Sequence, residues 1–212
     1  MTLFIQAFRY AGEPFFFAYA KARDARETYA LVLNWFVIFC VFIFLLVTLY
    51  IDVFRYFIGE AYREGLHVVP ILLVANLFLG IYVNLSIWYK LTDRTLMGAW
   101  VALGGAALTV VLLAWWVPAF GYEGAAWAHL ACYGSMVLAS YVLGRKYYPV
   151  PYDVPRVVAY IVAGVTIFFL ARFLVAQADL NTLVAGSLGL GLFVALVYRF
   201  DGRRLVHRLK AA

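Results

Sequence analysis

The region from Leu96 to Leu143 most strongly constrains the fold of this chain. It contains two apolar segments of 22 residues each, 96–117 and 122–143, joined only by Pro-Ala-Phe-Gly. A helix of 22 residues is about 33 Å long, enough to cross a hydrocarbon layer of roughly 30 Å. Pro118 and Gly121 are expected to end the first helix and let the chain reverse. The sequence therefore predicts a transmembrane helical hairpin.

Small residues recur at helical spacing on both segments of this hairpin. They are Gly98, Ala102 and Ala106 on the first segment, and Gly124, Ala128 and Cys132 on the second. Lipid supplies no hydrophobic drive for helix association, so membrane helices pack closely through such small residues. We expect the two segments to contact each other along these positions.

The composition of the whole chain agrees with membrane insertion. Apolar residues make up 67% of the sequence and charged residues only 13%, whereas soluble domains are about half apolar and about a quarter charged. We therefore predict an integral membrane protein embedded in the lipid bilayer. The net charge of +6 also suits a protein that binds nucleic acid, but the basic residues lie in short loops between apolar segments. We interpret them as signals of topology and expect no nucleic-acid partner.

The chain divides into apolar spans without any competing strand pattern. We predict an all-α, polytopic transmembrane bundle with six clear spans and one imperfect N-terminal span, 3–20, which is interrupted by charge and by Pro14. The clear spans are 31–51, 66–89, 96–117, 122–144, 156–176 and 181–199. We expect three regions: a main bundle over 1–144, a peripheral hairpin over 156–199, and a basic tail over 200–212.

The distribution of basic residues predicts the orientation of the chain. If the loops alternate across the membrane, two basic loop residues, Arg55 and Arg63, lie on one side and twelve lie on the side of the C-terminal tail. Such a bias places the richer side, and the C-terminus, in the cytoplasm. The twelve are Lys21, Arg23, Arg26, Lys90, Arg94, Arg145, Lys146, Arg156, Arg203, Arg204, Arg208 and Lys210.

Three stretches of the sequence point to a family. They are QAFRYAGEPFFFAYAK at 6–21, NLFLGIYVNLSIWYKLTDRT at 76–95, and VPAFGYEGAAWAHL at 117–130. In their order and spacing they resemble the bacterial polysaccharide and O-antigen flippases of the multidrug/oligosaccharidyl-lipid/polysaccharide exporter superfamily. Proteins of this family have two lobes of helices around a central cavity. They move an undecaprenyl-diphosphate-linked oligosaccharide across the cytoplasmic (inner) membrane for lipopolysaccharide or polysaccharide biosynthesis.

The resemblance implies a role and a missing partner for this chain. Residues 1–144 correspond to part of the C-terminal lobe, and 156–199 to the last two helices of the family. The N-terminal lobe is then expected as a partner in cis or in trans, and transport is expected to work by alternating access. Two alternatives remain open: a non-transporting membrane scaffold of a glycan-assembly complex, and a small-molecule antiporter of the same superfamily.

Arg9 and Glu13 are the first candidate residues for substrate binding. They lie four positions apart, on one face of a helix, and are able to pair. Arginine at the centre of a membrane helix costs roughly 2.5–3.5 kcal/mol, so such charges usually face protein or water. One interpretation is that Arg9 attracts the diphosphate, with Glu13 as its counter-ion or as a protonatable coupling group. The other is that both charges lie among lipid headgroups.

Asn76 and Asn84 form a second set of candidates. With Gly80 between them, they make one polar and small stripe along the predicted span 66–89. This stripe either lines an aqueous path or packs and hydrogen-bonds against a neighbouring helix.

Lys90 and Arg94 complete the candidates, because they lie in a predicted cytoplasmic loop where the diphosphate would be met. Topology alone is an alternative explanation for both charges.

The sequence contains no pattern typical of a catalytic centre. Its three histidines are far apart in the predicted topology, and neither paired cysteines nor a His-Glu-x-x-His spacing is present; the histidines are His67, His129 and His207. We expect no enzymatic activity, no metal and no cofactor.

Overall fold

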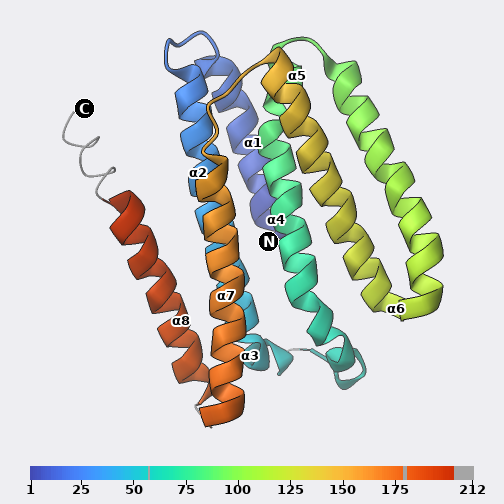
Figure 1. Cartoon of the computed structure of the whole chain (residues 1–212), viewed down its shortest axis with the longest axis vertical. Coiled ribbons are helices and arrows are strands. Elements are labelled where there is room, and N and C mark those ends of the chain that lie inside the picture. The colour runs from blue at the N-terminus through green and yellow to red at the C-terminus, as the bar shows by residue number, and fades with distance from the viewer. Residues whose placement is uncertain (57, 179–180, 203–212) are drawn as a thin grey trace. The chain divides into compact units, whose positions relative to one another are not determined.

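The computed structural model describes residues 1–56, 58–178 and 181–202, and every element in that part of the chain is helical (Figure 1). Within these described residues, five helices are long and apolar enough to cross a membrane: Ala25–Leu49, Tyr62–Leu91, Thr95–Tyr147, Val154–Gln177 and Thr182–Gly202. The predicted all-α fold is therefore confirmed, together with helices that are long and apolar enough to span a membrane. The number of spans stays a prediction, because the helix Thr95–Tyr147 contains a reversal of the chain.

The chain forms two compact units, which are described separately. The first unit comprises Met1–Val37 and His67–Val154, and the second comprises Ile38–Leu66 and Pro155–Ala212. The sequence had suggested a division near residue 150 only. In the structure, residues 38–66 belong with the C-terminal helices, because Val41 packs directly against Gly164.

The first unit is built from α1 (Thr2–Tyr19), the first part of α2 (Ala25–Leu49), α4 (Val69–Leu85), α5 (Ile87–Leu91) and α6 (Thr95–Tyr147). Helix α1 contacts both α4 and α5.

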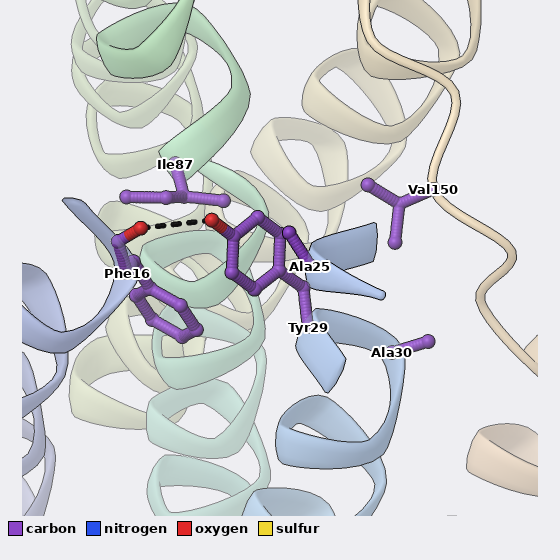
Figure 2. Close-up of a cluster of buried hydrophobic side chains, with 6 residues drawn as sticks. All are labelled: Phe16, Ala25, Tyr29, Ala30, Ile87 and Val150. Carbon is purple, nitrogen blue, oxygen red and sulfur yellow. Dashed lines mark hydrogen bonds between the residues drawn. The ribbon is translucent and has the colours of Figure 1, made fainter. Parts of the chain in front are cut away.

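A buried cluster joins the ends of α1 and α2 to α5 and to the segment that follows α6. Its centre is Tyr29, whose hydroxyl donates a hydrogen bond of 2.8 Å to the carbonyl oxygen of Phe16 (Figure 2). The rings of these two residues also meet edge to face, with centroids 5.0 Å apart. The cluster comprises Phe16, Ala25, Tyr29, Ala30, Ile87 and Val150.

Helix α6 is the predicted hairpin, and its two halves run side by side (Figure 1). The reversal occurs at Gly121, whose φ of 58° and ψ of −138° lie outside the helical region. Glycine has no Cβ and adopts this conformation without the steric cost that other residues meet. Pro118 lies inside the helix instead of ending it. The expected hairpin is thus confirmed, but Gly121 alone breaks the helix.

The small-residue contacts of the hairpin follow the prediction on one half only. On the first half Ala102 and Ala106 are exposed, and the predicted Gly98 is buried but contacts Tyr89 of α5. The close contact with the second half is made by Gly105, against Met136. Residues four positions apart on a helix point in directions that differ by about 40°, so a series at this spacing moves away from the contact face. Residues seven positions apart, such as Gly98 and Gly105, lie on nearly the same face. On the second half the predicted residues are buried: Gly124, Ala128 and Cys132.

The second unit contains the remainder of α2, the short helix α3 (Ile51–Arg55), α7 (Val154–Ala178) and α8 (Thr182–Val197). The 3₁₀ helix η1 (Glu60–Val68) crosses the boundary between the units. The side chain of Leu49 packs against Gly189 of α8, and the hydroxyls of Tyr50 and Ser187 are 2.8 Å apart. The predicted C-terminal helical pair is present as α7 and α8.

The end of α8 continues into a π-helical turn, η2 (Tyr198–Gly202). Within it Asp201 is buried and accepts a hydrogen bond from Arg156 Nη1 at 3.1 Å and another from the hydroxyl of Tyr160. Residues 200–202 were expected to begin a basic tail and are instead part of the folded second unit. The rest of the predicted tail, 203–212, lies outside the described residues.

Candidate substrate-binding site

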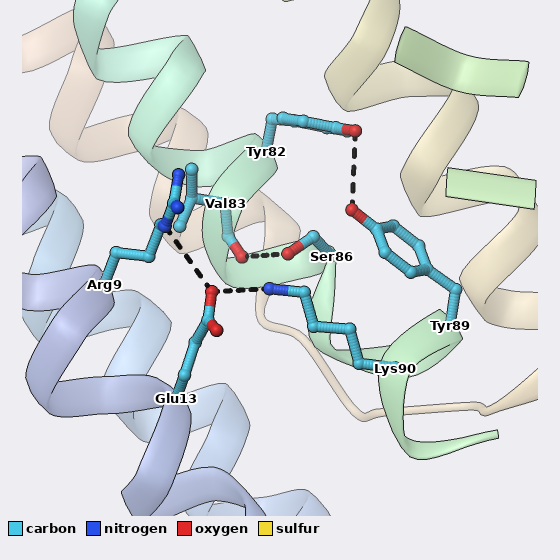
Figure 3. Close-up of polar contacts among 7 residues, drawn as sticks. All are labelled: Arg9, Glu13, Tyr82, Val83, Ser86, Tyr89 and Lys90. Carbon is cyan, nitrogen blue, oxygen red and sulfur yellow. Dashed lines mark hydrogen bonds and ion pairs between the residues drawn. The ribbon is translucent and has the colours of Figure 1, made fainter. Parts of the chain in front are cut away.

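A cluster of three charged side chains lies where α1 meets α5 in the first unit. Glu13 Oε1 accepts a hydrogen bond from Lys90 Nζ at 2.5 Å and lies 3.6 Å from Arg9 Nε (Figure 3). The predicted pairing of Arg9 and Glu13 across one helical turn is therefore confirmed. The contribution of Lys90 to the same carboxylate was not expected, because the sequence placed Lys90 in a loop.

Local structure explains how Lys90 reaches α1. The hydroxyl of Ser86, between α4 and α5, donates to the carbonyl oxygen of Val83 at 2.6 Å (Figure 3). Ile87 and Trp88 are buried at the start of α5 and hold this short helix in place. Lys90 then lies in the last turn of α5, where a positive charge also interacts favourably with the helix dipole.

The electrostatics of the cluster leave it with an excess of positive charge. One carboxylate faces two cations, and the exposed fractions of the side chains are 46% for Arg9, 36% for Glu13 and 25% for Lys90. The cluster is therefore open enough for another group to reach the cations. Lysine and arginine both bind phosphate oxygens, and charged groups in such surroundings interact more strongly than in bulk water. A phosphate group is thus able to compete with Glu13 for Lys90 and Arg9.

The asparagine stripe of α4 faces neighbouring helices. Asn76 Oδ1 accepts a hydrogen bond of 3.2 Å from the Thr2 hydroxyl on α1. A Cβ on Gly80 would lie only 2.5 Å from the Phe36 ring of α2, so this ring fills the space beside Gly80. For Asn76 these contacts favour the packing interpretation over an aqueous path.

Asn84 differs from Asn76. Its Nδ2 donates to the carbonyl oxygen of Gly80 in its own helix at 3.1 Å. Its Oδ1 is buried and has no hydrogen-bond partner among the residues that the structure describes. Asn84 therefore makes no hydrogen bond to the charged cluster within that part of the chain.

Arg94 lies outside the charged cluster. It precedes α6, and its guanidinium carbon is 4.2 Å from the centroid of the Tyr147 ring. Tyr147 in turn stacks on Trp88, with centroids 5.8 Å apart, and Trp88 Nε1 donates to the Ser140 hydroxyl at 3.2 Å. Lys90 and Arg94, which were predicted to act together, therefore have different partners.

Sequence reasoning did not find this aromatic support for Arg94. Two features of the sequence could have indicated it: the adjacent tyrosines that follow Lys146, and Ser140 within an apolar span. Only the fold brings Trp88, Ser140 and Tyr147 together, since they come from segments about fifty residues apart in the sequence.

A cavity of about 380 Å³ lies between the two halves of α6. Its lining is mostly apolar, with Met97, Trp100 and Met136 among the lining residues, and it contains none of the six residues predicted to bind substrate.

No protein family, curated protein or solved structure matches this chain. Among the described residues, no group of three or more histidine, cysteine, aspartate or glutamate side chains is arranged to hold a metal ion. The function is therefore inferred from the residues and from their geometry.

Proposed function

We propose that this chain is the C-terminal part of a membrane transporter that flips an undecaprenyl-diphosphate-linked oligosaccharide across the bacterial cytoplasmic membrane. The observation that carries the proposal is the cluster of Arg9, Glu13 and Lys90. It joins 6–21 to 76–95, two of the three stretches whose sequences resemble the flippases. A shared ion pair between these stretches supports a common role for them.

The chemistry of the cluster suits a lipid-linked diphosphate. The diphosphate carries several negative charges, and charge-assisted hydrogen bonds from Lys90 and Arg9 would hold it. In the absence of substrate Glu13 neutralises part of this positive charge, which lowers the cost of keeping cations near the hydrocarbon region. Glu13 also stays the residue expected from the sequence to couple transport to an ion.

The remaining parts of the transporter follow from the resemblance. The N-terminal lobe, in cis or in trans, would close the passage against the first unit. Alternating access would then expose the cluster to one side of the membrane at a time. The C-terminus would lie in the cytoplasm, as the distribution of basic residues predicts.

The test is a flipping assay in proteoliposomes with a fluorescent lipid-linked oligosaccharide. We expect transport only when an N-terminal flippase lobe is fused to the chain or co-reconstituted with it. Glu13→Gln and Lys90→Gln are expected to lower the transport rate at least tenfold. A factor of ten corresponds to about 1.4 kcal/mol.

A matched control is available in η1. Arg63 pairs with Glu60 at 3.5 Å, three positions away, and Arg63→Gln should leave transport unchanged. Export of small cations without any effect on surface glycan would instead identify an antiporter. Stable binding of glycan-synthesis enzymes without transport, with or without the lobe, would identify a scaffold.

A further inference from the structure

Two arginines are held against adjacent tyrosines at the end of α6. The guanidinium carbon of Arg94 lies 4.2 Å from the centroid of Tyr147, and that of Arg26 lies 4.7 Å from the centroid of Tyr148. Lys146 Nζ is 5.4 Å from the Tyr147 centroid. The cations come from the start of α2, the turn before α6 and the end of α6. One Tyr-Tyr pair therefore gathers positive charge from three parts of the sequence.

The position of Arg94 is set by its surroundings. Asp93 has a φ of 54°, which is uncommon for a residue other than glycine. The turn is closed by a hydrogen bond of 2.8 Å from the backbone N–H of Arg94 to the carbonyl oxygen of Tyr89. The Tyr147 ring that contacts Arg94 stacks in turn on the Trp88 ring. Arg94 is thus supported by an ordered aromatic stack.

The position of Arg26 is supported in a similar way. Tyr148 packs against the buried cluster around Tyr29 and Phe16. Its ring is therefore fixed by the core of the first unit, and Arg26 lies over it.

Both guanidinium groups remain available to an anion. Within the described part of the chain, neither Arg26 nor Arg94 forms an ion pair with a carboxylate. Both side chains are exposed. A guanidinium placed over an aromatic ring still has N–H donors that are able to bind the oxygens of a phosphate group.

We propose that Arg26 and Arg94, supported by Tyr148 and Tyr147, bind the phosphate headgroups of anionic phospholipids. The positive-inside distribution requires only charge at this end of the spans. The contacts with Tyr147 and Tyr148 also hold the two guanidinium groups in place, at the depth where aromatic residues of membrane proteins meet lipid headgroups. The partner is thus the anionic leaflet of the membrane, and this inference does not depend on the transport activity proposed above.

The test measures lipid retention by the purified full chain with native mass spectrometry. Phosphatidylglycerol is compared with phosphatidylcholine, and inorganic phosphate is added as a competitor. We expect selective retention of phosphatidylglycerol, with its affinity lowered about fivefold by Arg94→Gln or Arg26→Gln, since about 1 kcal/mol is the usual contribution of one basic residue near an anionic membrane surface. Tyr147→Leu should lower the affinity as well, although no charge is removed. Arg55→Gln, on the predicted opposite side, is the control.

Two results would overturn the proposal. If Tyr147→Leu and Tyr148→Leu leave the affinity for phosphatidylglycerol unchanged, charge alone is responsible. If millimolar inorganic phosphate displaces the lipid, the arginines bind a free anion and not a headgroup. Should the leucine variants be unstable, Arg94→Lys serves in their place: it keeps the charge, loses the planar stack, and is expected to bind phosphatidylglycerol more weakly than the unchanged chain.

Discussion

Lys90 Nζ lies 2.5 Å from Glu13 Oε1, although the two residues are separated by 77 positions in the sequence. The contact fastens α1 to the end of α5. It also brings a cation from the predicted cytoplasmic end of one span to a carboxylate within the imperfect N-terminal span. The same ion pair therefore serves packing and holds Lys90 at the proposed phosphate-binding site.

The coupling between Glu13 and Lys90 is open to measurement by a double-mutant cycle. Both side chains are partly exposed, so we expect a coupling energy of about 1 kcal/mol between Glu13→Gln and Lys90→Gln. The free energy of unfolding would be measured by titration with a denaturing detergent. The same cycle on Glu60 and Arg63, whose glutamate is 89% exposed, should give a smaller value. Equal coupling energies would show that the ion pair between α1 and α5 is no stronger than an exposed pair within one helix.

Gly80 is expected to tolerate no side chain. A Cβ at this position would lie 2.5 Å from Cζ of Phe36, so Gly80→Ala forces the ring to move and should destabilise the first unit by about 1–3 kcal/mol. Adding Phe36→Leu should recover part of that loss. Gly104→Ala is the control, because nothing lies within 4 Å of its added Cβ. Similar effects of the two alanine variants on the unfolding free energy would contradict this close contact.

Much of the helical architecture was predictable because it depends on local properties. Apolar length alone located the hairpin of α6, and the four-residue spacing of Arg9 and Glu13 correctly predicted their pairing. The role of Pro118 was not predictable in this way. A proline inside a membrane helix is tolerated where neighbouring groups satisfy the backbone, so its presence did not decide where the helix ended.

The candidate substrate-binding site was only partly predictable, for a different reason. Lys90 and Arg94 look equivalent in the sequence, as two cations on either side of Asp93. The fold gives them separate partners, because the positive φ of Asp93 turns the chain between them. Glu13 and Tyr147 are contributed by distant helices. Helical spacing carries no information about such contacts.

The turn of the α6 hairpin should be sensitive to a single methyl group at Gly124. A Cβ there would lie 2.5 Å from the backbone oxygen of Trp116, and backbone atoms move less readily than a flexible side chain. Gly124→Ala is therefore expected to destabilise the chain by about 2 kcal/mol or more. Gly134→Ala, in the same half of α6 but with open space around the added Cβ, should be neutral or slightly stabilising. Cysteine cross-linking between the two halves would show whether the hairpin opens.

The stability of the chain should fall at alkaline pH through Tyr152, in the segment between α6 and α7. Burial raises the pKa of Tyr152, and the neighbouring Tyr148 and Tyr29 add to the effect. A raised pKa means that the folded state favours the neutral phenol. The stabilisation of the folded state by the neutral phenol is complete below the unfolded pKa of about 10. It is lost as the pH rises above that value. Thermal unfolding between about pH 8 and pH 11 should therefore depend less on pH in Tyr152→Phe. Tyr62→Phe, at an exposed position, should keep the original dependence.

The second unit should depend on Arg156 through its contact with Asp201. Asp201 is buried in η2, and Arg156 Nη1 lies 3.1 Å from its carboxylate. Arg156→Gln removes the cation that pairs with this carboxylate in the described part of the chain, and breaking a buried pair from one side costs about 3 kcal/mol. We expect η2 to detach from α7, with faster proteolysis after α8 and a lower unfolding temperature. Arg199→Gln removes an exposed charge from the same turn and should have little effect. An equal loss in both variants would mean that net charge, and not the pairing with Asp201, holds the end of α8 in place.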